Sequence, residues 1–137
     1  MNILILNGPN LNLLGKREPE LYGGSDFESF YEILQQDYSN VNFEYFQSNH
    51  EGFLLDKLHE DRWDGIVMNP GGLAHTSIVL LDAIKAIETP VIEVHITDVM
   101  KREPYRHVLL SSQACKLTLS GRGLDGYKEA VECFLKD

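Results

Sequence analysis

The residues best suited to chemistry begin in one long loop near the start of this 137-residue chain. The segment 7–24 reads N-G-P-N-L-N-L-L-G-K-R-E-P-E-L-Y-G-G and follows the apolar run Ile3–Leu6. A connection of that length is unusual in a compact domain, and such loops are commonly either functional or disordered. Because Arg17 and Tyr22 stand at fixed places among glycine and proline, we expect a catalytic lid that carries a tyrosine base.

Tyr22 needs a lowered pKa to act as a base, since a free tyrosine titrates near 10. A nearby guanidinium favours the phenolate and stays protonated itself. Arg17, five residues earlier in the same loop, is well placed for this role. A loop tyrosine more often packs on the surface, and that simpler role stays open.

A second group of polar residues ends the apolar run 91–95, V-I-E-V-H. Strand alternation places Glu93 and His95 on one face. A carboxylate beside an imidazole favours the protonated ring and fixes its orientation, which suits a general acid. The alternative is a core histidine whose hydrogen bonds are satisfied by its neighbour.

A third group follows the apolar run 65–69. Asn69 is costly to bury without partners, so it needs either a ligand or a tight local hydrogen bond. His75 comes after the Gly71-Gly72 turn, near the expected start of a helix, where free amides suit an anion or a carbonyl oxygen. His75 could instead simply cap that helix.

Strand and helix patterns alternate along the chain. Apolar runs predict strands over residues 2–6, 41–46, 65–69, 91–95 and 116–119, and helical spacing predicts helices over 26–38, from about 51 onwards, 76–88 and 124–135. Ser25–Glu28 and Ser48–Glu51 both match the S-x-x-E capping box. The helix that begins near residue 51 is expected to have an apolar face of Phe53, Leu54, Leu55 and Leu58. The helix over 76–88 is expected to bury Ile78, Leu81, Ala83, Ile84 and Ile87.

Near-continuous apolar strands indicate a parallel sheet covered on both faces. We therefore predict one α/β domain over residues 1–137: a flavodoxin-like three-layer sandwich, with a five-stranded parallel sheet in the order 2-1-3-4-5 and helices on both faces. Such folds bind ligands at the carboxyl ends of the strands, where the three polar groups fall.

The net charge of −9 argues against nucleic acid and anionic membrane as partners. The basic residues nevertheless gather in two loops, which suggests a small anionic ligand, although solvated charges explain them equally well: Lys16, Arg17, Lys101, Arg102 and Arg106.

The sequence has no apolar run long enough to cross a bilayer and no signal-peptide pattern, so we expect a cytoplasmic protein. Cys115 and Cys133 are interpreted as reduced structural thiols, with a single disulfide as the alternative.

Four motifs in order carry a specific resemblance: N-G-P-N-L-N-L-L-G-K-R-E-P-x-x-Y-G, S-N-H-E-G, N-P-G-G-L-A-H-T-S and E-V-H-I-T. Together with the arginine loop and the final G-L-D-G-Y, they resemble type II 3-dehydroquinate dehydratase over essentially the whole chain. The resemblance implies a flavodoxin-like enzyme of the shikimate pathway or of quinate breakdown, without metal or organic cofactor. It would convert 3-dehydroquinate to 3-dehydroshikimate by anti elimination through an enolate.

The same resemblance implies the catalytic roles. Tyr22 would take the C2 proton, with Arg17 keeping it ionised. Asn10, with an ordered water, would stabilise the enolate oxygen at C3. His95, oriented by Glu93, would protonate the leaving C1 hydroxyl.

The remaining implied residues bind substrate and include one from another subunit. Asp82 matches a residue that family members donate from a neighbouring subunit of a dodecamer, which is a tetramer of trimers. Thr97 stands where serine is frequent in the family, and it keeps the hydroxyl. The ring hydroxyls of the substrate would be held by Asn69, His75 and Arg106. The substrate carboxylate would be held by Ile96 and Thr97. Arg102 would help to close the site.

Other functions fit the residues less well. A lysine iminium enzyme would need a lysine at the end of a strand, but Lys57, Lys85 and Lys128 lie on expected helices. A phospho-receiver needs aspartates where this chain has asparagines, and a flavin module needs a hydroxyl-rich phosphate loop. A metal hydrolase using His75, His95 and Glu93 matches no standard metal spacing.

The long loop is expected to divide into two parts. Residues 7–10 should form a fixed turn that presents Asn10. Residues from about Leu13 to Tyr22 should form the moving lid.

Overall fold

The computed structural model describes residues 1–16 and 26–137. Within these residues, five strands form one parallel sheet in the order β2-β1-β3-β4-β5, which confirms the predicted order. The strands are β1 (Asn2–Asn7), β2 (Asn42–Gln47), β3 (Gly65–Asn69), β4 (Val91–His95) and β5 (Leu117–Ser120).

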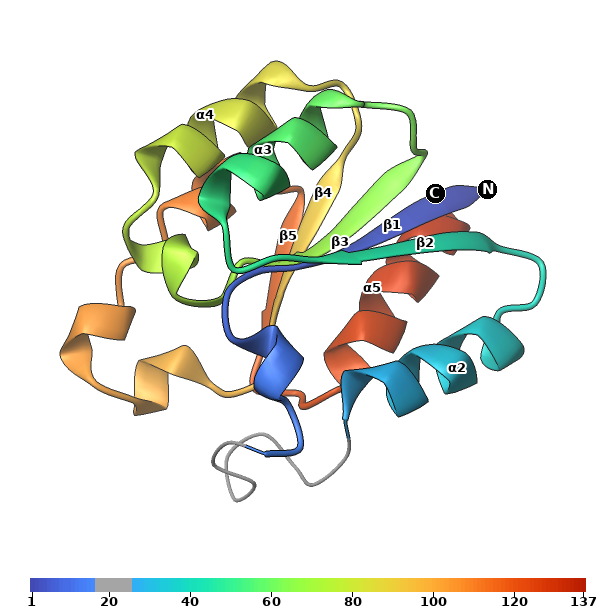
Figure 1. Cartoon of the computed structure of the whole chain (residues 1–137), viewed down its shortest axis with the longest axis horizontal. Helices are drawn as coiled ribbons and strands as arrows, with labels where there is room; N and C mark the ends of the chain where they lie inside the picture. The colour runs from blue at the N-terminus through green and yellow to red at the C-terminus, as the bar shows by residue number, and fades with distance from the viewer. Residues whose placement is uncertain (17–25) are drawn as a thin grey trace.

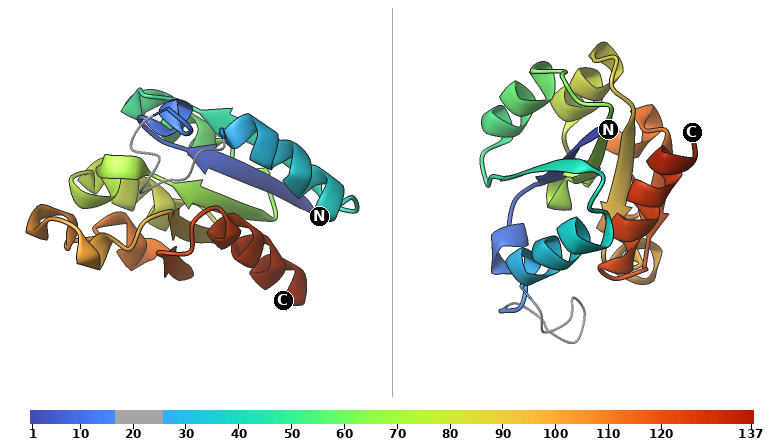
Figure 2. Two further views of the ribbon diagram at one scale, coloured as in Figure 1. Left: turned by 90° about the horizontal axis from the view of Figure 1, so that it is seen from below. Right: turned by 90° about the vertical axis from the view of Figure 1, so that its right-hand side faces the viewer.

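Helices cover both faces of the sheet, as predicted. In Figure 1, α3 and α4 lie on one face, and α2 and α5 lie on the other. Figure 2 shows the same three layers from two further directions. The helices are α2 (Phe27–Asp37), α3 (Glu51–His59), α4 (Ile78–Ala86) and α5 (Asp125–Lys136).

Short 3-10 helices follow three of the strands at their carboxyl ends (Figure 1). After β1 comes η1 (Leu11–Leu13), and after β3 comes η2 (Gly71–His75). The long connection after β4 contains η3 (Val99–Lys101), η4 (Pro104–Arg106) and η5 (Ser111–Ala114). These connections replace ordinary tight turns with the extra backbone that builds the site.

The alternation of side chains along β1 explains its continuous apolar sequence. Ile3 and Ile5 enter the cluster under α2 and α5, whereas Leu4 and Leu6 enter the cluster under α3 and α4. Both faces of the strand are therefore removed from water, and each fully buried side chain contributes about 1.5–3 kcal/mol. The same double burial applies to β3 and β4, whose residues are all buried.

The two predicted capping boxes were wrong. Asp26 is the N-cap of α2, and its carboxylate accepts a hydrogen bond from the Ser29 amide at 2.7 Å. The N-cap of α3 is His50, which makes no side-chain capping bond. Ser48 instead accepts from the His50 amide at 2.9 Å and so shapes the loop before the helix. The other end of that motif, Glu51, accepts from Ser77 of the next helix segment.

The predicted burial of Phe53 and Ile78 was also wrong, because they are 56% and 62% exposed. Neighbouring helix positions are about 100° apart around the axis, so a residue next to the core face can point outward. The rest of the predicted faces is largely confirmed, because α3 and α4 bury five of the expected side chains together with Leu80: Leu54, Leu58, Leu81, Ala83 and Ile84.

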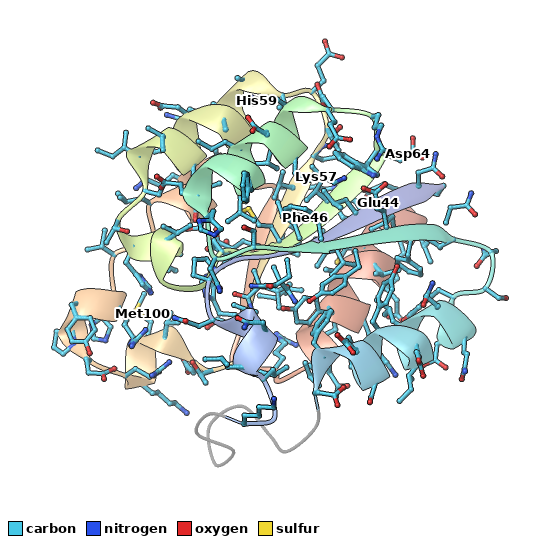
Figure 3. The ribbon with its side chains drawn as sticks, viewed as in Figure 1. Glu44, Phe46, Lys57, His59, Asp64 and Met100 are labelled. Carbon is cyan, nitrogen blue, oxygen red and sulfur yellow. The ribbon has the colours of Figure 1, made fainter. Side chains whose placement is uncertain are left out.

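The edge strand β2 is covered by charged side chains. Lys57 reaches from α3, forms an ion pair with Glu44 and lies 5.3 Å from the centre of the Phe46 ring (Figure 3). Arg62 also pairs with Glu44, at 2.6 Å. Charges at an open sheet edge discourage pairing with another strand.

The two cysteines lie on opposite faces of the sheet. Cys115 packs against the cluster under α3 and α4, and Cys133 packs against the cluster under α2 and α5. Both are free thiols. In the described ranges, no helix combines the length and the apolar character that crossing a membrane requires.

Candidate active site

A cavity of about 190 Å³ lies at the carboxyl ends of β1, β3 and β4. The order of the strands reverses between β1 and β3, and a doubly wound fold is expected to bind its ligand at that point. Eight of the predicted site residues line this cavity: Asn10, Asn69, His75, His95, Ile96, Thr97, Arg102 and Arg106. Five further lining residues are Pro9, Leu11, Gly71, Gly72 and Val99.

The loops after β1 and β3 touch backbone to backbone at the cavity wall. The Gly8 amide donates to the Asn69 carbonyl at 2.7 Å. A β-carbon on Gly8 would lie 2.6 Å from the Pro70 carbonyl oxygen. Gly71 has a φ of +60°, and a β-carbon there would lie 2.8 Å from the Pro9 carbonyl oxygen. Only glycine permits this approach, which accounts for the glycines of both motifs.

Asn10 is fixed by its backbone rather than by its side chain. It adopts a left-handed conformation with a φ of 72°, which asparagine tolerates better than most residues. Its amide donates to Asn49 Oδ1 at 2.9 Å, and Gln47 Nε2 donates to the same oxygen at 3.2 Å. These bonds leave the Asn10 side chain exposed at the cavity. Sequence reasoning missed Asn49, although it stands in the S-N-H-E-G motif.

Asn69 has the local hydrogen bonds that one of its two predicted explanations required. Its Nδ2 donates to the Tyr127 hydroxyl at 3.0 Å, and its Oδ1 accepts from the Gly71 amide at 3.1 Å. The Tyr127 hydroxyl in turn donates to Asn7 Oδ1 at 2.8 Å. Burial raises the pKa of Tyr127, so the phenol stays neutral and serves as both donor and acceptor. The chain Asn7–Tyr127–Asn69 thereby links β1, α5 and β3 beneath the cavity.

Glu93 and His95 lie on one face of β4, as the alternation predicts. His95 Nε2 is 2.7 Å from Glu93 Oε2, and both side chains are buried. The other carboxylate oxygen, Oε1, accepts from the Ser111 hydroxyl at 2.5 Å. The Cys115 thiol lies 3.9 Å from the same oxygen, and burial together with the nearby carboxylate raises its pKa. Sequence reasoning missed Ser111, because nothing in the loop after β4 marks it.

His75 lies shortly before α4, as expected, but it does not cap that helix. It is the last residue of η2, and the cap of α4 is Ser77, whose hydroxyl accepts from the Leu80 amide at 2.9 Å. His75 Nδ1 lies 2.8 Å from the Val108 carbonyl oxygen. Its ring centre lies 6.3 Å from that of His95, so the two imidazoles share one wall of the cavity.

The part of the cavity lining that holds Arg102 and Arg106, here called the charged wall, is positively charged. Arg102 donates to the Thr97 hydroxyl at 3.4 Å, and Arg106 donates to Glu103 at 2.9 Å. The backbone amide of Glu103 and the Arg106 guanidinium hold the pKa of the Glu103 carboxyl at about 2. Two guanidinium groups share this single carboxylate, because Arg102 Nε also lies 3.7 Å from it. The wall suits an anionic ligand.

Among the described residues, the predicted site residues Glu93 and Asp82 do not line the cavity, and Glu93 acts behind His95. Arg17 and Tyr22 lie outside the described residues, as does most of the proposed lid. Asp82 is exposed on α4 and does not line the cavity of its own chain. Over residues 1–16 and 26–137, no group of three or more His, Cys, Asp or Glu side chains is arranged to hold a metal ion. Glu93 is instead used by His95 and Ser111.

Comparison with known proteins gives a consistent result. The family model described as "Dehydroquinase class II" matches residues 1–135. A 3-dehydroquinate dehydratase of Bacillus pumilus is 45% identical over 140 residues, covering 99% of this chain and 95% of the relative. A catabolic 3-dehydroquinase of Phaeosphaeria nodorum is 44% identical over 135 residues, covering 96% and 89%.

Solved structures agree with these matches. The type II dehydroquinase from Butyrivibrio crossotus superposes with a TM-score of 0.95 at 39% identity, over 98% of this chain and 97% of the other. The receiver domain of a sensor histidine kinase from Pseudomonas aeruginosa superposes with a TM-score of 0.56 at 12% identity, over 99% and 98% of the two chains, which indicates a shared fold alone.

Proposed function

The chain belongs to the class II dehydroquinase family, and on that premise we propose that its cavity dehydrates 3-dehydroquinate to 3-dehydroshikimate. One observation carries the proposal: a single cavity is lined by two neighbouring imidazoles, two guanidinium groups and the exposed Asn10. These are the groups that an elimination next to a ketone and a carboxylate requires.

The first step is removal of the C2 proton. That proton is only weakly acidic, so its removal needs a positioned base and a group that stabilises the enolate. We assign the base to the Tyr22 phenolate, with Arg17 keeping it ionised. The electron pair of the C2–H bond then moves toward the C3 oxygen. We assign stabilisation of this oxygen to Asn10, assisted by a water molecule.

The second step is loss of the C1 hydroxyl. The enolate electrons form the C1–C2 double bond while the C1–O bond breaks, and the leaving oxygen must receive a proton. We assign this proton to His95. The contact between Nε2 and Glu93 at 2.7 Å supports the assignment, because it fixes the ring and leaves Nδ1 for the substrate. The departing group is therefore water rather than hydroxide.

The charged wall is proposed to bind the substrate carboxylate. The Thr97 hydroxyl and the backbone amides of Ile96 and Thr97 would donate hydrogen bonds to this carboxylate, with Arg102 beside them. His75, Asn69 and Arg106 would contact the ring hydroxyls. The bond between Arg102 and Thr97 supports this division, since it holds a donor pair together at one end of the cavity.

We further propose that the protein assembles as a dodecamer, a tetramer of trimers, in which Asp82 enters the site of a neighbouring subunit. Its exposed position on α4 supports this role, because Asp82 lies one helical turn from Ile78 and on the same face. Ile78 and Val79 are 62% and 49% exposed. Large apolar side chains beside an exposed carboxylate fit a subunit interface.

Ultraviolet absorbance tests the proposed reaction, since the product contains a conjugated double bond that the substrate lacks. We expect turnover of 3-dehydroquinate and no loss of activity after borohydride treatment in the presence of substrate. Inactivation by borohydride would indicate an iminium and would overturn the tyrosinate scheme. Absence of turnover in an assembled, folded protein would overturn the proposed function.

The tyrosine base has its own test. Tyr22→Phe should fold and assemble normally but lose at least about 10²–10⁴-fold in kcat, the usual contribution of a positioned base. A variant with wild-type turnover would contradict the assignment.

A further inference from the structure

We propose that Ser111 is a positioning residue for the dehydration, because its hydroxyl keeps Glu93 ionised and aimed at His95. The inference rests on the proposed function and extends the Glu93–His95 pair to a chain of three groups. Ser111 does not line the cavity and acts only through Glu93.

The geometry gives each oxygen of Glu93 its own donor. Oε2 lies 2.7 Å from His95 Nε2, and Oε1 accepts from Ser111 Oγ at 2.5 Å. Glu93 and Ser111 are both 0% exposed. A buried carboxylate is very costly to keep charged unless both of its oxygens are hydrogen-bonded. Ser111 therefore provides the second of two bonds that the charge needs.

Cys115 cannot replace the hydroxyl. Its thiol is 3.9 Å from the same carboxylate oxygen, whereas the serine oxygen is 2.5 Å away. A thiol is also a weak donor. The titratable groups around the carboxylate are then His95 on β4, Cys115 after η5 and, beyond His95, the ring of His75 on η2.

Ser111 is held in place by the loop that also supports His75. The Leu110 amide donates to the Ala74 carbonyl at 2.7 Å, and the Val108 carbonyl lies 2.8 Å from His75 Nδ1. The segment 108–111 thus contacts His75 directly and also contacts Glu93, the partner of His95. Ser112 follows Ser111 in the chain, but its hydroxyl donates to the Leu109 carbonyl at 3.0 Å and not to Glu93.

Loss of the Ser111 hydroxyl should favour transfer of a proton from the His95 imidazole to the Glu93 carboxylate. With Oε1 unpaired, the ionic state of the pair becomes less favourable than the state with a neutral carboxyl and a neutral imidazole. His95 would then lack the proton that the leaving hydroxyl requires. Substrate contacts would be unchanged, so the effect belongs in kcat.

The test compares Ser111→Ala with the matched control Ser112→Ala in the assembled enzyme. We expect Ser111→Ala to lower kcat about 10-fold or more while KM stays within about 2-fold. The basic limb of its kcat–pH profile should move down by about one unit, which corresponds to that tenfold change, because the group that must be protonated is the general acid. Ser112→Ala should match the wild type, and Ser111→Thr should recover most of the loss because it keeps the hydroxyl.

A chemical measurement independent of turnover separates this inference from the proposed function. Diethyl pyrocarbonate acylates neutral imidazole, and peptide mass spectrometry can follow the reaction at His95. At mildly acidic pH the rate at His95 should rise about 10-fold in Ser111→Ala and stay unchanged in Ser112→Ala. If Ser111→Ala does not fold, Ser111→Cys keeps the volume and should show the same increase.

Two results would overturn the role of Ser111. One is a folded Ser111→Ala or Ser111→Cys protein with wild-type acylation of His95. The other is a loss of activity confined to KM. Inactivity of the wild-type protein toward 3-dehydroquinate would overturn the proposed function instead, while the acylation rates would still report on Ser111.

Discussion

Tyr127→Phe removes one oxygen atom from a buried hydrogen-bond chain and should be strongly destabilising. The Tyr127 hydroxyl donates to Asn7 Oδ1 at 2.8 Å and accepts from Asn69 Nδ2 at 3.0 Å. The ring itself would remain packed, with its centre 4.9 Å from that of Phe27 and 5.8 Å from that of Phe30. The change therefore isolates the loss of the two polar contacts.

The expected magnitude follows from the two amide groups that lose a partner. Leaving a buried donor or acceptor unsatisfied costs about 1–3 kcal/mol, so the free energy of unfolding should fall by about 2–4 kcal/mol. The atoms left without this partner are Asn69 Nδ2 and Asn7 Oδ1, whereas Asn69 Oδ1 still accepts from the Gly71 amide and Asn7 Nδ2 still donates to the Tyr45 hydroxyl at 3.4 Å. Because Asn69 lines the cavity, KM for 3-dehydroquinate should also rise.

Urea unfolding at a fixed protomer concentration measures this effect, since assembly makes the apparent stability depend on concentration. The control is Tyr38→Phe. Tyr38 donates to Glu132 at 2.8 Å near the surface, and burial together with that carboxylate raises the pKa of Tyr38 to about 12. Water can replace this bond, so Tyr38→Phe should cost less than about 1 kcal/mol. Equal losses in the two variants would refute the reasoning about buried amides.

Three other changes test separate features. His95→Ala should lower kcat about 10²–10⁴-fold with little change in KM, and a rise in KM alone would make His95 a binding residue. Asp82→Ala should lose activity while size-exclusion chromatography shows intact assembly, whereas unchanged kinetics would argue against a contact between subunits. Hydrogen bonds from the Thr89 side chain and from the Glu88 and Thr89 amides hold the pKa of Asp61 below its usual 3.8, so its charge stabilises the fold above that pH. Asp61→Asn should lower the urea midpoint at pH 7, and the difference from wild type should shrink as the pH falls below 3.8, because protonation then removes the same contribution.

The sheet could be predicted from sequence because burial on both faces leaves a distinct pattern. Residues 3–6, 65–69 and 91–95 are apolar runs, and the structure buries them completely. The helix starts could not be predicted as well. Ser25 and Ser48 each stand in an S-x-x-E pattern, but Asp26 provides the first cap and Ser48 binds its own loop. A short pattern cannot reveal which of two neighbouring polar groups the folded chain will use.

The candidate site divides in a similar way. His95 and Thr97 were found because they stand in motifs that adjoin strand ends and line the cavity directly. Asn49, Ser111 and Tyr127 were missed because each acts through another residue. Their partners lie 39, 18 and 58 residues away in sequence, respectively. Such contacts are set by the packing of separate elements, and no local spacing encodes them.

The backbone contact between the loops after β1 and β3 has a consequence for redesign of the site. Gly8 and Gly71 have no room for a β-carbon, so every other amino acid at these positions would push the two loops apart. Directed-evolution libraries aimed at new ring substrates should therefore keep both glycines invariant. Diversity is better placed at Leu11 and Val99, whose side chains also line the cavity. The backbone around Gly8 and Gly71 must therefore stay unchanged, whereas the side chains of Leu11 and Val99 can be varied to alter the shape of the cavity.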